Sequence, residues 1–226
     1  IGKNSYITGA YATYVGQEIG KFYGWVYEGI ARTQDELDGH ATQQGANVGD
    51  CLYKDISGPN GEPDGVIDAY DQTVLGSGLP KVNFGLSTHM EYKGFDLNIS
   101  TYGVLNYHVS DDIYNSLNSC YGYGNKEVGM LDANRWSEDG STYLSSVPRT
   151  YAANNATLGW NDLFSSRKIQ NAAYWKIANV ELGYNFPDKW FGGYVSGVRL
   201  YVSAQNLYTF TGYHGYNVDY AGGTFT

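Results

Sequence analysis

The amino-acid sequence predicts an all-β protein, and more narrowly an antiparallel segment of a transmembrane β-barrel with long external loops. Two pairs of segments alternate apolar and polar side chains, the pattern of strands with one apolar face. The connections between these strands alternate long and short, as they do in outer-membrane barrels. The 226 residues include 23 tyrosines and 30 glycines, a composition that favours strands and turns over helices.

The first pair of strands is predicted at 82–92 and 95–109. Lys93 and Gly94 form a two-residue turn of the kind that joins β-hairpins. On the predicted apolar face lie Val82, Phe84, Leu86, Thr88, Met90 and Tyr92 from the first strand, and Phe95, Leu97, Ile99, Thr101, Leu105, Tyr107 and Val109 from the second. Pairing across the turn sets Tyr92 beside Phe95, Met90 beside Leu97 and Leu86 beside Thr101, so the apolar faces coincide.

A second pair of strands is predicted at 174–186 and 198–207, joined by the shorter link 187–197. The apolar face of this pair contains Val180, Leu182, Tyr184, Phe186, Val198, Leu200, Val202 and Ala204. A further, less regular strand is predicted within 21–30. The segments 31–80 and 110–173 are predicted to be long connections.

The order of the connections favours a membrane barrel over a soluble fold. Long and short connections alternate, and the strands have the length of roughly 9–11 residues or more that crosses a bilayer. Tyr92 and Phe95 would then lie in an aromatic girdle. About five strands cannot close a membrane barrel, and an open sheet edge is not stable in hydrocarbon. We therefore expect the chain to be part of a larger barrel.

A second interpretation is a secreted β-sandwich that binds calcium and carbohydrate. It differs in one feature, because a sandwich would bury Phe84, Leu86, Leu97 and Ile99 in its own core, whereas a barrel turns them to lipid. Both interpretations are non-enzymatic. The sequence contains no nucleophile motif, no phosphate-binding glycine loop and no paired histidine spacing.

Composition excludes some classes of partner and indicates whether the chain is part of a longer protein. The formal net charge of −9 argues against nucleic acid as a partner. No apolar run approaches the roughly 18 residues of a membrane helix. The chain starts at Ile1 without an initiator methionine, so we expect an internal piece of a longer protein. Cys51 and Cys120 are too few for a disulfide scaffold, and their pairing stays open.

The stretch NGEPDGVIDAYD at 60–71 resembles a calcium-binding loop. Oxygen-bearing side chains occupy its first, third, fifth, ninth and twelfth places, and a glycine occupies the sixth. Its flanks show no helical periodicity, so it is not a complete EF-hand. A calcium site and an acidic turn held by side-chain to backbone hydrogen bonds both remain open. No cofactor is required, and calcium is the only candidate; its ligands would be Asn60, Glu62, Asp64, Asp68 and Asp71.

Aromatic side chains in the long connection 110–173 are candidate contacts for a substrate or a partner. Sugar rings stack on such side chains, although loop aromatics also pack a loop on itself. The candidates are Trp136, Trp160, Tyr121, Tyr123 and Tyr143.

Several motifs in order resemble the late barrel of SusC/RagA-like TonB-dependent transporters. DGVID at 64–68 precedes PKVNFG at 80–85 and the hairpin YKGFDL at 92–97. NRW at 134–136 and PR at 148–149 fit the loop that follows. The segments 165–187 and 197–220 resemble the family's final strands. The insertion GPNGEP at 58–63 departs from the shorter family turn.

This resemblance implies a 22-stranded outer-membrane barrel in a Bacteroides-type bacterium, filled by an N-terminal plug and driven through TonB. It also implies a SusD-like surface lipoprotein as a lid, lipid around the barrel, and oligosaccharide or oligopeptide as the imported substrate. The chain 1–226 would be the C-terminal part of the barrel, with the plug and the final strand absent from it. Its long loops would be extracellular.

Overall fold

The computed structural model describes residues 6–8, 11–13, 18–119, 128, 135–137, 145–150, 159–195, 197–215 and 217–220. The chain divides into two compact units. The sheet unit comprises Pro80–His108 and Asn171–Tyr220, and the loop unit includes Ile1–Leu79 and Val109–Gln170. Among the described residues, no helix is long and apolar enough to cross a membrane.

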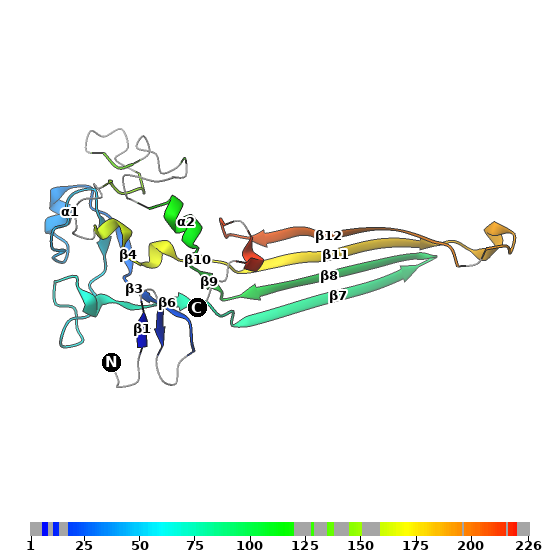
Figure 1. Ribbon diagram of the computed structural model, residues 1–226, viewed down its shortest axis with the longest axis horizontal. Coiled ribbons are helices and arrows are strands. Elements are labelled where there is room, and N and C mark those ends of the chain that lie inside the picture. The colour runs from blue at the N-terminus through cyan, green and yellow to red at the C-terminus, as the bar shows by residue number, and fades with distance from the viewer. Residues whose placement is uncertain are drawn as a thin grey trace. The chain divides into compact units, whose positions relative to one another are not determined.

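The sheet unit is built on four long antiparallel strands in the order β12-β11-β8-β7 (Figure 1). Their bounds are β7 (Val82–Tyr92), β8 (Phe95–Leu105), β11 (Tyr174–Asn185) and β12 (Arg199–Thr211). The β11–β12 link contains the short 3₁₀ helix η6 (Asp188–Phe191), and η7 (Val218–Tyr220) follows β12. Both predicted hairpins are therefore confirmed.

The register of the β7–β8 hairpin is the predicted one. Tyr92 pairs with Phe95, and Met90 pairs with Leu97. The two turn residues have positive φ, 49° at Lys93 and 89° at Gly94. This backbone matches the twist of the flanking strands, which is why a two-residue turn closes the hairpin tightly.

The second predicted strand, 95–109, ends earlier than expected. β8 stops at Leu105, because Asn106 adopts a positive φ of 54° and interrupts the extended backbone. Tyr107 and Val109 are consequently buried instead of continuing the exposed apolar face. β11 carries a bulge at Ala178, where its register with both neighbours shifts.

The loop unit contains short strands and helices in segments that were predicted to be long connections. Its four-stranded sheet has the order β1-β2-β3-β6, and β4 pairs with β5. The strand bounds are β1 (Tyr6–Thr8), β2 (Tyr11–Thr13), β3 (Lys21–Gly24), β4 (Tyr27–Ile30), β5 (Cys51–Tyr53) and β6 (Thr73–Ser77). The helical elements are α1 (Gln34–Asp38), η1 (Ala69–Asp71), α2 (Asp112–Leu117), η4 (Trp160–Asp162) and η5 (Ser166–Lys168). The short strands β9 (His108–Val109) and β10 (Gln170–Asn171) pair with each other, and each has one residue in either unit. The strand predicted within 21–30 is thus two short strands.

A small hydrophobic core organises the loop unit. Cys51, Tyr53 and Ile67 are buried at its centre, and Trp25 and Trp160 pack against it. Cys120 lies outside the described residues, so whether it pairs with Cys51 stays open. The core draws on segments far apart in the chain, which fixes the loops as one unit.

Candidate functional site

A buried polar cluster holds together three segments of the loop unit. The Arg149 guanidinium donates two hydrogen bonds to the Asp50 carboxylate, from Nε to Oδ1 at 2.6 Å and from one terminal nitrogen to Oδ2 at 2.8 Å. Asn161 donates to Asp50 Oδ1 at 2.8 Å and accepts from the backbone N–H of Cys51 at 2.7 Å. The hydrogen bond with Asp50 raises the pKa of Arg149 above its ordinary value, so the guanidinium stays protonated.

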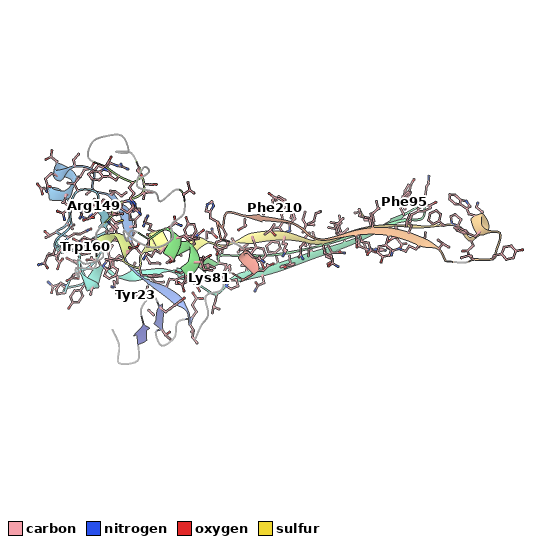
Figure 2. All side chains as sticks on the ribbon, turned by 45° about the horizontal axis from the view of Figure 1, so that its top comes forward. Tyr23, Lys81, Phe95, Arg149, Trp160 and Phe210 are labelled. Carbon is pink, nitrogen blue, oxygen red and sulfur yellow. The ribbon has the colours of Figure 1, made fainter. Side chains whose placement is uncertain are left out.

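The structure places Trp136 and Trp160, two of the predicted contacts, in packed positions of the loop unit. Figure 2 shows Trp160 among the other side chains of the loop unit. Its ring centroid lies 6.1 Å from that of Tyr53, and its indole donates to the Gln44 carbonyl oxygen at 3.1 Å. Trp136 is only 8% exposed. Both indole rings pack within the loop unit, and the Trp136 indole nitrogen has no hydrogen-bond partner among the described residues. The role of both residues as contacts stays a prediction. Tyr121, Tyr123 and Tyr143 lie outside the described residues.

Gly49 is the residue that allows Trp136 to pack. Its φ is +93°, and a Cβ atom built there would lie 2.5 Å from the Trp136 ring. We expect Gly49→Ala to destabilise the loop unit by about 2 kcal/mol, because it combines backbone strain with a clash. The measurement is the rate of limited proteolysis of the loops in the complete protein.

Gly45→Ala is the matched control for this variant. Gly45 also has a positive φ, +77°, but nothing lies within 4 Å of its added Cβ. Its cost should be about 1 kcal/mol from the backbone alone. Equal proteolysis of the two variants would show that the Trp136 contact adds nothing.

The acidic segment 60–71 is a turn held by its own carboxylates. Asp71 is fully buried, and its carboxylate accepts hydrogen bonds from the backbone N–H groups of Ile56, Ser57 and Asp68. Asp68 caps η1 by accepting from the Tyr70 N–H, and Asp64 accepts from the Val66 N–H. These bonds match the turn interpretation. Asn60 and Glu62 are exposed.

No three of the described His, Cys, Asp or Glu side chains come together in a group that could hold a metal ion. The carboxylates of Asp64, Asp68 and Asp71 accept instead from nearby backbone N–H groups. Calcium binding by this segment stays a prediction.

The two faces of the sheet unit differ in chemistry. On one face, Arg199 forms ion pairs with Asp96 on β8 and with Glu181 on β11, the latter at 2.6 Å. Asn185 adds a hydrogen bond to Asp96 at 3.2 Å. A Cβ on Gly183 would collide with both Asp96 and Arg199, so the glycine leaves room for this pair.

The opposite face is apolar and exposed. Leu86 is 63% exposed and Val202 is 67% exposed, although both are aliphatic. Phe84 is 38% exposed, and neither Leu97 nor Ile99 belongs to the buried core. The sandwich interpretation requires these side chains in a protein core, and the structure does not place them there. A large exposed apolar face in a sheet marks an interaction with lipid or protein.

Aromatic rows lie at both ends of this apolar face. Phe95 and Tyr184 pack together beside the hairpin turns with tilted rings, their centroids 4.6 Å apart. At the other end, Trp175 stacks on Phe210 at 5.2 Å, in register with Phe84 on β7. Phe84 and Tyr92 mark the two rows on β7 and are about 26 Å apart along the strand. This spacing agrees with the apolar band of about 25 Å between the aromatic girdles of outer-membrane barrels.

Sequence reasoning missed most of the buried cluster. Asp50 carries no local signal, because its partner Arg149 lies 99 residues away. Arg149 belongs to the PR motif that resembles the transporter family, and this motif is the one sequence signal for a member of the cluster. Gln43 forms one hydrogen bond with the backbone of Cys51 and one with that of Tyr53, and no sequence pattern indicated this role.

The two-faced sheet defines an all-β protein with one ion-paired face and one exposed apolar face, the arrangement typical of the strands of outer-membrane barrels. Comparison with known proteins makes the class more specific. The chain is 31% identical over 202 residues to TonB-dependent receptor P3 of Formosa agariphila, a match that covers 88% of the chain and 18% of that receptor. It is 26% identical over 176 residues to TonB-dependent receptor SusC of Bacteroides thetaiotaomicron, covering 73% of the chain and 16% of SusC. No family model matches the chain.

Solved structures show the same fold. The chain matches the structure of the RagAB peptide transporter with a TM-score of 0.72 and 22% identity, over 97% of this chain and 22% of that one. It matches the RagAB peptide importer in its open-open state with a TM-score of 0.69 and 24% identity, over 98% and 22%. Sequence and fold agree that the chain is a SusC/RagA-like segment of a TonB-dependent transporter. It spans about a fifth of the length of the curated relatives that it matches.

Proposed function

We propose that the complete protein is an outer-membrane importer, and that this chain supplies part of its barrel wall and external loops. The observation that carries the proposal is the exposed apolar face between two aromatic rows, opposite an ion-paired polar face. Lipid would cover the first face, and the interior of a closed barrel of 22 strands would lie against the second. The curated relatives are named as TonB-dependent receptors, which supports a role without catalysis.

The energy for import would come from outside this chain. Ladder hydrogen bonds fix the strands, so a TonB-driven plug and a SusD-like lipoprotein lid are the proposed moving parts. The loop unit would face the exterior of a Bacteroides-type cell, where the substrate arrives. The RagAB relatives are named as peptide importers, and oligopeptides or oligosaccharides are the proposed substrates here.

Deletion of the complete transporter tests this proposal in the bacterium that encodes it. Uptake of one oligomeric nutrient should be lost, while uptake of the corresponding monomer should be unchanged, because small solutes cross by other pores. Growth on the oligomer and its depletion from the medium provide the measurement. Restored uptake from a plasmid copy is the control. Unchanged growth on every oligosaccharide and oligopeptide tested would refute the import function.

A further inference from the structure

A cavity in the loop unit has the features of a binding site for an acidic ligand. Its volume is about 310 Å³. Its walls come from four parts of the loop unit: Tyr27 on β4, Tyr114 and Asn115 on α2, Ser146 in the segment 145–150, and η5 with its two cations Arg167 and Lys168. None of these residues belongs to the Asp50–Arg149 cluster.

The walls are fixed to one another by hydrogen bonds, so the cavity is preformed. The backbone N–H of Tyr27 donates to Ser166 Oγ at 3.0 Å, which joins β4 to η5. Asn115 donates from its amide nitrogen to the Lys168 carbonyl oxygen at 3.3 Å and to Ser110 Oγ at 3.0 Å, which joins α2 to η5. A preformed cavity loses little conformational entropy when a ligand binds.

The charge of the cavity is opposite to that of the chain. The described lining contains Arg167 and Lys168 and no carboxylate, whereas the chain has a formal net charge of −9. Lys168 Nζ donates to the Asp162 carbonyl oxygen at 2.5 Å, and the Asp162 carboxylate lies 3.7 Å away. An ammonium group has three donors, so Lys168 retains donors for a ligand. Arg167 and Lys168 follow one another on η5, and a guanidinium or an ammonium in a cavity wall favours a carboxylate or sulfate group.

The cavity also offers neutral polar groups. Within the described part of the chain, the Tyr114 and Ser146 hydroxyls form no hydrogen bond with protein, and the Asn115 side-chain oxygen accepts none. Hydroxyl and amide groups of this kind bind the hydroxyls of a sugar ring, and a tyrosine ring offers it an apolar face. One recurring mode of peptide binding adds a strand to a sheet edge, and most of this lining comes from helices and loops instead.

From this combination we infer that the cavity binds an acidic oligosaccharide, one whose sugar units carry carboxylate or sulfate groups. Arg167 and Lys168 bind the anionic group, and Tyr114, Asn115 and Ser146 bind the neighbouring hydroxyls. The inference rests on the proposed import function and names the substrate class of its external loops.

Binding of the complete, detergent-purified transporter to an array tests this inference. The array carries uronate-containing, sulfated and neutral oligosaccharides together with acidic peptides. We expect retention of the uronate or the sulfated oligosaccharides, and the pattern tells which anion the cavity prefers. Arg167→Gln should weaken that binding about tenfold or more, because a charge-assisted hydrogen bond is lost. Lys189→Gln, an exposed cation in the β11–β12 link, is the matched control and should bind normally.

A second variant guards against misfolding of the first. Ser146→Leu fills the cavity without removing a hydrogen bond seen in the structure, and it should also weaken binding of the acidic oligosaccharides. Retention of neutral oligosaccharides alone, retention of peptides alone, no retention, or normal binding by both variants would each overturn the inference. Any of these results with intact nutrient uptake refutes the cavity assignment only, whereas the deletion experiment tests import itself.

Discussion

Replacing Ala204 by arginine is expected to destabilise the complete transporter in a bilayer by about 2–4 kcal/mol. Ala204 lies on the apolar face of β12, where it pairs with Val180, which in turn pairs with Ile99. Ile99 pairs with Thr88, midway between Phe84 and Tyr92, the positions of the two aromatic rows on β7. The new guanidinium would therefore lie near the bilayer midplane. The measurement is guanidinium-induced unfolding in lipid vesicles, followed by the mobility of folded protein in gels.

The adjacent residue provides the control. Gln205 is exposed on the polar face of the same strand and pairs with Asn179. Gln205→Arg adds the same charge one position away, and it should change the free energy of unfolding by about 1 kcal/mol or less. If the two arginine variants lost equal stability, the apolar face would not be the lipid face.

The second large effect is expected from Arg149→Met in the loop unit. The Asp50 side chain is only 6% exposed, whereas that of Arg149 is 35% exposed. Removing the cation leaves a buried carboxylate without its partner, which should destabilise the loop unit by about 3 kcal/mol. Asp50→Asn leaves the guanidinium without its carboxylate instead, and it should cost less, about 1–2 kcal/mol, because the Arg149 side chain is 35% exposed and water reaches it. Thermal unfolding of the loops, read by protease cleavage, provides the measurement.

The asymmetry between these two variants is the informative result. The double variant should be more stable than the sum of the single losses predicts, because it leaves no unpaired charge in the cluster. Lys54→Met removes an exposed cation from the same unit and should have little effect. A larger loss from Asp50→Asn than from Arg149→Met would contradict the burial argument.

Local sequence patterns were sufficient for the sheet unit. The period-two alternation of 82–92 and 95–105 fixed both strands and their apolar face, and the Lys93-Gly94 turn fixed their register. These features depend on neighbours within a few residues, so a sequence can encode them visibly. The motifs also indicated the transporter family correctly. The strand end at Asn106 and the bulge at Ala178 were missed, since polar and small residues occur in regular strands as well.

The loop unit depended on the tertiary structure. Asp50 and Arg149 lie 99 residues apart, and the walls of the cavity come from residues as distant as Tyr27 and Lys168. No periodicity relates such positions, because their contacts form only when the loops fold against a common core of Cys51, Tyr53 and Ile67. The same packing buries Trp136 and directs the Asp71 carboxylate to the backbone N–H groups around its own turn. The sequence by itself thus determined the strands, their faces and the family, whereas long-range packing decided which loop side chains are left to meet a ligand.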